Sequence, residues 1–397
     1  MDVGEVEALL SEAGRTLADR FFPYDSATAM NLGQRARREA PADLVAAAMT
    51  QARLRTKAIE RLGPDAERLW FTPDGLEQAT RPDVARHRAQ HLVASGATRV
   101  ADVGCGLGFD SHAMARAGLT VLAIERDPAT AALARANAAA LDLSEVITVV
   151  TAEATDVDLV ALGCDAVFID PARREGGRRV KDPQKWSPPW SAALSIAATM
   201  PMAGLKVAPG IDHALPPEQA TTEWISDHGH LVEACVWLGS AADPQLRRRA
   251  TMLPSGESVT DAELPAEITV GALGRYLLEP DDAVIRSGLV GVVAHRVNGR
   301  LIDASIAYLT CDETVAASPM YAAFEVIESW PFSLKHLRKR VHALGIGRVE
   351  VKKRGSAIDP EVLRKQLKLD PHNAVDAVIL LTRLRQDPFV VIAKRVS

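Results

Sequence analysis

The spacing of apolar positions changes near residue 95 of the 397-residue chain. Before that point apolar side chains recur at the three- and four-residue intervals of an amphipathic helix, as at Leu44, Val45, Ala48 and Met49. Prolines divide this pattern into segments that suit separate short helices. We therefore expect a small helical domain over residues 1–95.

Beyond residue 98, short β-branched runs alternate with alanine-rich segments of helical length. We expect strands at Thr98–Val103, Leu119–Ile124, Val146–Val150, Asp165–Ile169 and Leu205–Pro209, with helices before Ala117, at Pro128–Leu141 and at Ser191–Thr199. This alternation predicts a parallel sheet with right-handed crossovers and helices on both faces. Runs at Leu231–Leu238 and Arg249–Leu253 would close the sheet as a hairpin, so this α/β domain is expected over residues 96–257.

A second α/β region is expected over residues 272–397. Its predicted strands are Arg275–Leu278, Ser305–Leu309, Ala322–Ile327, Arg348–Lys352, Val375–Leu381 and Phe389–Ala393. Its predicted helices are Ala283–His295, Ser333–Leu344 and Pro360–Leu367.

Composition narrows the class of protein. The chain is 47% hydrophobic and 24% charged, as in ordinary globular proteins, and it has no apolar run near the roughly 20 residues that span a bilayer. Its acidic, amphipathic start differs from a signal peptide, so we expect a cytoplasmic protein. Four widely spaced cysteines predict reduced thiols, and no histidine pair has a third ligand at a recognisable spacing, so we expect no metal.

Charge is unevenly distributed along the chain. Residues 325–397 hold 15 basic and 8 acidic side chains, whereas the first 324 residues hold 31 basic and 43 acidic ones. A basic patch attracts phosphates without reading a base sequence, and an ordinary solvated surface has the same composition. The tail therefore indicates a nucleic-acid partner without establishing one.

Three glycines follow the first predicted strand, at positions 104, 106 and 108. Glycine allows a sharp turn and a close approach of the backbone to a ligand. The next predicted strand ends at Glu125, where a carboxylate can accept both hydroxyls of a ribose. This pair suits a dinucleotide or S-adenosylmethionine, but the third glycine of a dinucleotide fingerprint would stand at position 109, which is Phe109.

The form GxGxG preceded by Asp102 is similar to motif I of class I S-adenosylmethionine-dependent methyltransferases. The resemblance implies a Rossmann-like sheet and S-adenosylmethionine as the cofactor. The residues that it implies bind the cofactor are Thr80, Asp102, Gly104, Gly106, Gly108, Asp110, Glu125, Arg126 and Glu153.

The fourth predicted strand of the first sheet ends at Asp170-Pro171. Ligands of an open parallel sheet bind beyond the carboxyl ends of its strands, so Asp170 is expected beside the cofactor. A carboxylate that accepts one hydrogen of a base amine, with a backbone carbonyl accepting the other, would direct the lone pair of that amine at a methyl donor. Because proline constrains this turn, Asp170 and Pro171 are the candidate catalytic residues.

The order of these motifs resembles RNA guanine-N2 methyltransferases of the trimethylguanosine-synthase type. The resemblance rests on Thr80–Ala85, Asp102–Asp110, Glu125–Pro128, Ala134–Asn137 and Phe168–Pro171. The whole chain looks like bacterial class I methyltransferases with a THUMP-like C-terminal domain, here about residues 320–397. Because THUMP is a tRNA-binding module, the resemblance favours RNA as the partner.

The chain departs from the amine methyltransferases directly after Asp170-Pro171, where they carry a second proline and an aromatic residue. Here these positions are Ala172 and Arg173. Arg173 and Arg174 are candidates for substrate contact or for surface ion pairs, and Lys206 is a candidate cation of the pocket. The segment Ser187–Trp190 matches the missing motif, but no hydrophobic strand precedes it, so we expect a loop there. Trp186 and Trp190 are expected in the core, and the alternative is that one of them folds back as the missing stacking surface.

The candidate RNA-binding side chains lie in two basic clusters of the tail. They are Lys335, Arg338, Lys339, Lys352, Lys353 and Arg354. The leading hypothesis is a methyltransferase that acts on a base amine in structured RNA, such as tRNA or rRNA. The alternatives are a non-catalytic RNA-binding protein that retains the cofactor fold as a scaffold, and a small-molecule methyltransferase.

Overall fold

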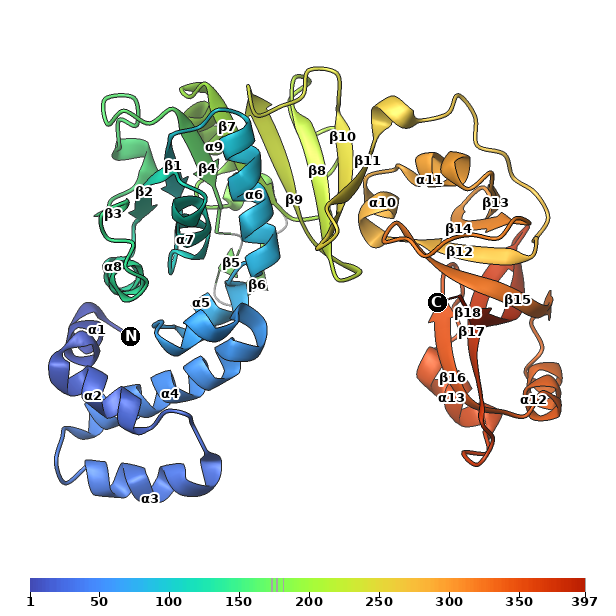
Figure 1. Ribbon diagram of the computed structural model, residues 1–397, viewed down its shortest axis with the longest axis horizontal. Coiled ribbons are helices and arrows are strands. Elements are labelled where there is room, and N and C mark those ends of the chain that lie inside the picture. Colours follow the sequence, from blue (N-terminus) through green and yellow to red (C-terminus); the bar gives the residue numbers. More distant parts are fainter. Residues whose placement is uncertain (173, 176–177, 181, 397) are drawn as a thin grey trace. The chain divides into compact units, whose positions relative to one another are not determined.

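The computed structural model describes residues 1–172, 174–175, 178–180 and 182–396 (Figure 1). The chain forms two compact units. The first holds Met1–Thr221 and Cys235–Pro244, and the second holds Thr222–Ala234 and Gln245–Ser397.

Most of the first 94 residues of the first unit are helical. The helices are α1 (Val3–Leu10), α2 (Glu12–Arg20), α3 (Ser26–Ala36), α4 (Ala42–Leu62), η1 (Pro64–Glu67), α5 (Pro73–Gln78) and α6 (Pro82–Ala94). Side chains of Asp2, Ser11, Asp25 and Thr72 accept hydrogen bonds from the first turns of α1, α2, α3 and α5, which explains where these helices begin.

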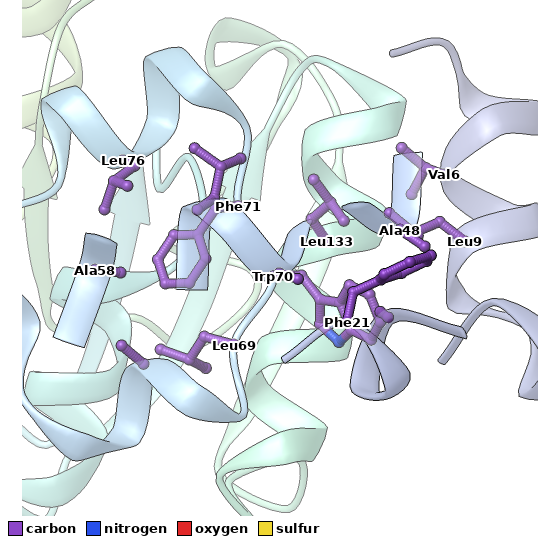
Figure 2. Packing of buried hydrophobic residues seen from close by; sticks show 14 of the residues in the cluster. Val6, Leu9, Phe21, Ala48, Ala58, Leu69, Trp70, Phe71, Leu76 and Leu133 are labelled. Carbon is purple, nitrogen blue, oxygen red and sulfur yellow. The ribbon is translucent and has the colours of Figure 1, made fainter. Parts of the chain in front are cut away.

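The helical region shares a hydrophobic core with the sheet region of the same unit. Val6, Leu9 and Phe21 pack in one cluster with Trp70 and with Leu133 of α8 (Pro128–Ala140), as Figure 2 shows. Leu107 of the glycine loop belongs to the same cluster. The N-terminal helices therefore help to hold the loop that the sequence assigns to the cofactor.

The segment Leu69–Phe71 lies in this core without regular secondary structure, and buried side chains bond its backbone. Gln51 accepts from the Phe71 N–H, and Arg55 donates to the Leu69 carbonyl. Asn137 accepts from the Trp70 N–H at 2.7 Å and donates to the Trp70 carbonyl. These bonds remove the cost of burying unpaired peptide groups.

A parallel sheet forms the rest of the first unit. Its strands are β1 (Arg99–Val103), β2 (Thr120–Glu125), β3 (Ile147–Thr151), β4 (Ala166–Ile169) and β7 (Met202–Val207), alternating with α7 (Phe109–Arg116), α8 and α9 (Trp190–Ala198). The order β3-β2-β1-β4-β7 and the parallel pairings confirm the predicted α/β architecture. In this arrangement the carboxyl ends of β1, β2 and β4 meet at one edge.

The sheet has nine strands in the order β11-β10-β8-β9-β7-β4-β1-β2-β3, where β8 is Thr221–Asp227, β9 is His230–Gly239, β10 is Arg248–Leu253 and β11 is Glu257–Thr260. The predicted hairpin between residues 231–238 and 249–253 is wrong. β8 and β9 form the hairpin instead, through His228 and Gly229, which both have positive φ, and β10 runs parallel to β8. Strand β8 was not predicted from the sequence because most of its buried side chains are polar and give no hydrophobic run.

Short elements complete the same part of the chain. They are β5 (Arg174–Glu175), β6 (Arg178–Arg179), η2 (Ala154–Asp156), η3 (Pro183–Lys185) and η4 (Asp261–Glu263). The four cysteines are buried. No helix in the described part of the chain is long and apolar enough to cross a membrane.

The second unit contains a seven-stranded sheet in the order β13-β14-β12-β15-β18-β17-β16 (Figure 1). The strands are β12 (Tyr276–Pro280), β13 (Arg300–Asp303), β14 (Ile306–Cys311), β15 (Tyr321–Pro331), β16 (Ile346–Lys353), β17 (Val375–Leu384) and β18 (Asp387–Arg395). The helices are α10 (Asp282–Arg286), α11 (Val290–Arg296), α12 (Leu334–Ala343) and α13 (Pro360–Leu367).

Two expectations for this unit need correction. The single helix expected at 283–295 is divided into α10 and α11, because the chain turns at Gly288 with a φ of +74°. Strand β13 was not expected. The sheet also curls strongly, since Lys352 of β16 reaches Glu279 of β12 although β15, β18 and β17 lie between these strands.

Candidate active site

The glycine loop joins β1 to α7. Gly104, Gly106 and Gly108 have φ angles of +76°, +55° and +89°, which side chains disfavour. A Cβ on Gly104 would lie 2.7 Å from the Asp170 carbonyl oxygen, so glycine is needed where the loop passes the end of β4. Apart from Gly106 and its two chain neighbours, no described residue has an atom within 4 Å of the corresponding point at Gly106.

Glu125, at the end of β2, connects the loop to the next helix. Its Oε2 accepts from the Gly106 N–H at 3.1 Å, and its Oε1 accepts from the Asp127 N–H at 2.9 Å. A carboxylate has about four acceptor positions, so this half-buried group keeps capacity for two more donors. The hydroxyls of a ribose match that capacity, and the open side of Gly106 leaves room for a ligand, so these residues fit S-adenosylmethionine.

Arg126 and Glu153 lie at the outer edge of this region. Both side chains are more than half exposed, and their charged groups are 3.7 Å apart. Glu153 follows β3, as expected for a side chain beside an adenine, and Arg126 follows Glu125. The structure therefore brings both residues together at the surface.

Three of the residues assigned to the cofactor are buried beneath the loop, where they bind protein atoms. Asp102 accepts from the Ser111 hydroxyl, and Thr80 donates to Asp110 Oδ2 at 3.0 Å. Burial, followed by the negative charges of Asp110 and Asp170, raises the pKa of Asp102 to about 7. In this structure the side chains of Asp102, Asp110 and Thr80 are bonded to other protein side chains.

Arg88 of α6 is fully buried beside Asp110 and Thr80, and it was not among the predicted site residues. Its Nη2 donates to Asp110 and, at 3.2 Å, to the Thr80 hydroxyl. Its guanidinium lies 4.6 Å from the ring centre of Phe168 on β4. The sequence contained a signal for its burial, because Arg88 lies four residues from Val84 and from Leu92, on the apolar face of α6.

Asn137 of α8 is a second such residue. It is fully buried, and besides holding Trp70 it donates to the Leu107 carbonyl at 3.1 Å. A polar residue inside an alanine-rich helix is a usable signal, because a buried amide needs partners. Asn137 therefore ties the glycine loop to the N-terminal core.

Asp170 lies directly after β4 and Lys206 lies in β7. The Lys206 ammonium donates to Asp170 Oδ2 at 2.7 Å and to the Thr80 hydroxyl at 3.0 Å. The Asp170 side chain is 28% exposed, whereas the Lys206 side chain is 9% exposed. Lys206 is therefore a buried partner of Asp170, and Asp170 remains accessible.

The segment after Pro171 pairs with a loop before α9. Ala172 and Ser187 exchange two backbone hydrogen bonds, so Ser187–Trp190 is the loop that was expected. Trp186 and Trp190 are 6% and 3% exposed and pack edge to face, as the core interpretation predicts. Arg173 and the side chain of Arg174 lie outside the described residues.

The basic candidates of the C-terminal tail fall into two groups. Lys352 pairs with Glu279 and Glu350, Arg354 pairs with Asp282, and Arg338 donates to the Gln366 carbonyl. Lys335, Lys339 and Lys353 are exposed, and no described acidic residue pairs with them. Three of the six candidate side chains therefore bond to other groups of the protein.

Family models match three parts of the chain. Residues 101–171 match a methyltransferase domain and residues 321–395 match a THUMP domain-like model. Residues 2–58 match a domain of unknown function. The first two matches cover the glycine loop with Asp170, and the C-terminal strands β15–β18 with their helices.

Whole-chain comparisons agree with these matches. Two sequences from two strains of Mycobacterium tuberculosis, both named uncharacterized S-adenosylmethionine-dependent methyltransferases, are 35% identical over 318 residues, or 78% of this chain and 84% of each relative. A crystal structure of a candidate methyltransferase from Porphyromonas gingivalis W83 covers 100% of both chains with a TM-score of 0.78 and 20% identity, and so shares the fold. The chain therefore belongs to the family of class I S-adenosylmethionine-dependent methyltransferases that includes the mycobacterial relatives, and it carries a THUMP-like domain near its C-terminal end.

Proposed function

We propose that this methyltransferase modifies a base amine in structured RNA, such as tRNA or rRNA, and that Asp170 binds the amine. The observation that carries the proposal is the position of Asp170, directly after β4, with its carbonyl oxygen against Gly104 and its carboxylate accessible. In this arrangement Asp170 accepts one N–H of the amine, and the carbonyl of Pro171 accepts the other.

Methylation of a base amine depends more on the orientation of the amine lone pair than on its deprotonation. An exocyclic amine shares its lone pair with the ring, and two acceptors in place direct that pair at the methyl carbon. S-adenosylmethionine supplies the methyl group, and its sulfonium leaves as a neutral thioether when the nitrogen–carbon bond forms. The nitrogen then releases one proton, for which Asp170 is the nearby acceptor.

The target base must leave its helix to reach Asp170, because the amine of a stacked base is inaccessible to a side chain at a sheet edge. The aromatic platform typical of amine methyltransferases is missing at positions 172 and 173, and Trp186 and Trp190 are buried. In the proposal, Arg173 or Arg174 supplies the contact with the base or with a phosphate.

RNA is favoured as the substrate by the C-terminal domain. The THUMP domain-like match covers residues 321–395, which include Lys335, Lys339 and Lys353. Their exposed ammonium groups suit phosphate contacts that are insensitive to base sequence. We propose that this domain docks the RNA and that the flipped base enters the site beside Glu125 and Asp170.

The proposal is tested by incubating the protein with labelled S-adenosylmethionine and RNA from a strain that lacks the gene. The wild type should label one nucleoside in digested RNA, and Asp170→Ala should lower the rate by about 10²–10⁴-fold, the usual contribution of a positioned acid or base. Asp156→Ala is the matched control, because that carboxylate is exposed and bonds only its neighbour Thr155 among the described residues.

Two results would contradict the proposal. Label confined to a metabolite fraction would make the enzyme a small-molecule methyltransferase. RNA label that persists with Asp170→Ala at the wild-type rate would remove Asp170 from the reaction.

A further inference from the structure

Thr80 occupies the centre of a buried group of charges. Its hydroxyl donates its hydrogen to Asp110 Oδ2 and accepts from Arg88 Nη2 and from Lys206 Nζ, at 3.0, 3.2 and 3.0 Å. A hydroxyl has one hydrogen and two lone pairs, so these three bonds use its full capacity. The direction of the Lys206 ammonium is consequently fixed from one side by Thr80.

Asp170 fixes the same ammonium from the other side. The 2.7 Å contact between Lys206 Nζ and Asp170 Oδ2 joins two ions, and such bonds are stronger than those between neutral groups. The Lys206 side chain is 9% exposed, so water competes little for the ammonium. The carboxylate of Asp170 is therefore attached at one oxygen to a rigid part of the fold.

A direct contact between Lys206 and the substrate amine is unfavourable. The amine gains positive charge as its nitrogen bonds to the methyl carbon, and a second cation beside it would raise the barrier by repulsion. Lys206 instead bonds Oδ2 of Asp170, and the substrate nitrogen would approach the other oxygen, Oδ1. Its charge is balanced by the carboxylate that receives the substrate.

We propose that Lys206 is a positioning residue, which occupies Oδ2 of Asp170 so that Oδ1 receives the substrate N–H in a fixed direction. The Thr80 hydroxyl holds Lys206 in turn and has no hydrogen-bonding capacity left for the cofactor. This inference rests on the proposed function, because it assigns the role of Asp170 to one of its two oxygens. It replaces the expectation that Lys206 and Thr80 bind substrate and cofactor directly.

The test compares Lys206→Met with Thr80→Val and Thr80→Ser. Lys206→Met should lower kcat by about 10²-fold, because a carboxylate free to rotate loses its alignment with the methyl carbon. The KM for RNA and the Kd for S-adenosylmethionine should stay within about twofold, since uniform binding is unchanged. Thr80→Val, which keeps the shape and removes the hydroxyl, should lower kcat by about tenfold. Thr80→Ser keeps the hydroxyl and should restore most of the rate.

The rates are measured on whichever fraction the wild type labels, RNA or metabolite, so the proposed function and this inference fail separately. The Kd for S-adenosylmethionine and the melting temperature show whether each variant folds. If Lys206→Met does not fold, Thr80→Val tests the inference in its place. A higher KM for the substrate with unchanged kcat would make Lys206 a substrate contact. An unchanged kcat in Lys206→Met, or equal rates for Thr80→Val and Thr80→Ser, would also overturn the inference.

Discussion

One group of ion pairs in each unit shows a different arrangement of charged residues. In the first unit Arg88, Asp110, Lys206 and Asp170 are connected through the Thr80 hydroxyl beneath the carboxyl ends of the strands. In the second unit a chain of ion pairs links strands of the curled sheet and joins Arg395, Glu350, Lys352 and Glu279. The Arg88 and Lys206 side chains of the first arrangement are almost fully buried, whereas the side chains of the second are partly exposed.

The difference shows how net charge misleads. The first 324 residues are acidic overall, yet one of their cations, Lys206, holds the proposed catalytic carboxylate in place. The tail is basic overall, yet Lys352 and Arg354 bind acidic residues of the same unit. The accessible charge of a surface depends on these pairs, which the composition does not show.

Removing Arg88 should produce the largest effect on stability. Arg88→Met would leave Asp110 buried without its guanidinium partner, and breaking such a pair costs about 3–5 kcal/mol. The free energy of unfolding from urea titration measures the loss. Arg86→Met on the same helix is the control, because its pair with Asp83 is exposed and should be worth less than about 1 kcal/mol. Equal losses for the two variants would mean that the buried group is no more important than a surface pair.

The pH dependence of stability should reveal Asp102. Its pKa is about 7 in the folded chain and about 3.9 in an unfolded chain, so between these values the folded state keeps a proton that the unfolded state releases. The free energy of unfolding therefore loses this contribution as the pH rises from about 4 to about 7. Asp102→Asn cannot titrate, so its stability relative to the wild type should increase over that range by up to about 1.4 kcal/mol per pH unit.

The titration of His112 is the reason for comparing Asp102→Asn with the wild type. Burial, followed by the charge of Arg116, lowers the pKa of His112 to about 3. This histidine favours folding as the pH rises from about 3 to about 6.5, so it opposes Asp102 in the wild type. The difference between Asp102→Asn and the wild type cancels the histidine. A difference that does not change between pH 4 and 7 would contradict the raised pKa of Asp102.

The parallel sheet and the glycine loop were predictable from the sequence because their signals are local. The β-branched runs, the glycines of the loop and Glu125 at the end of β2 each lie within a few residues of the feature that they determine. The resemblance of the motifs to known methyltransferases added the cofactor. These expectations are confirmed by the strand order and by the family match.

Some of the features that were missed depend on partners distant in sequence. Arg88 meets Asp110 and Phe168, and Lys352 meets Glu279, which lies 73 residues away. Strand β8 has buried polar side chains, so its hydrophobic pattern was too weak to predict. The division of the helix at Gly288 has a local signal that apolar periodicity obscured.

The smallest expected effect distinguishes accessible lysines from paired ones in the tail. Lys335→Gln with Lys339→Gln should weaken binding to bulk tRNA by about tenfold and reduce the slope of log K against log salt by roughly 2, because each phosphate contact releases about one counterion. Lys352→Met removes the same charge from a side chain that already binds Glu279, so it should change affinity by less than about twofold while lowering the melting temperature. Fluorescence anisotropy at several salt concentrations measures both. If Lys352→Met weakened RNA binding as much as the double variant, the pair with Glu279 would not withhold Lys352 from RNA, and the contrast between the two kinds of basic residue would fail.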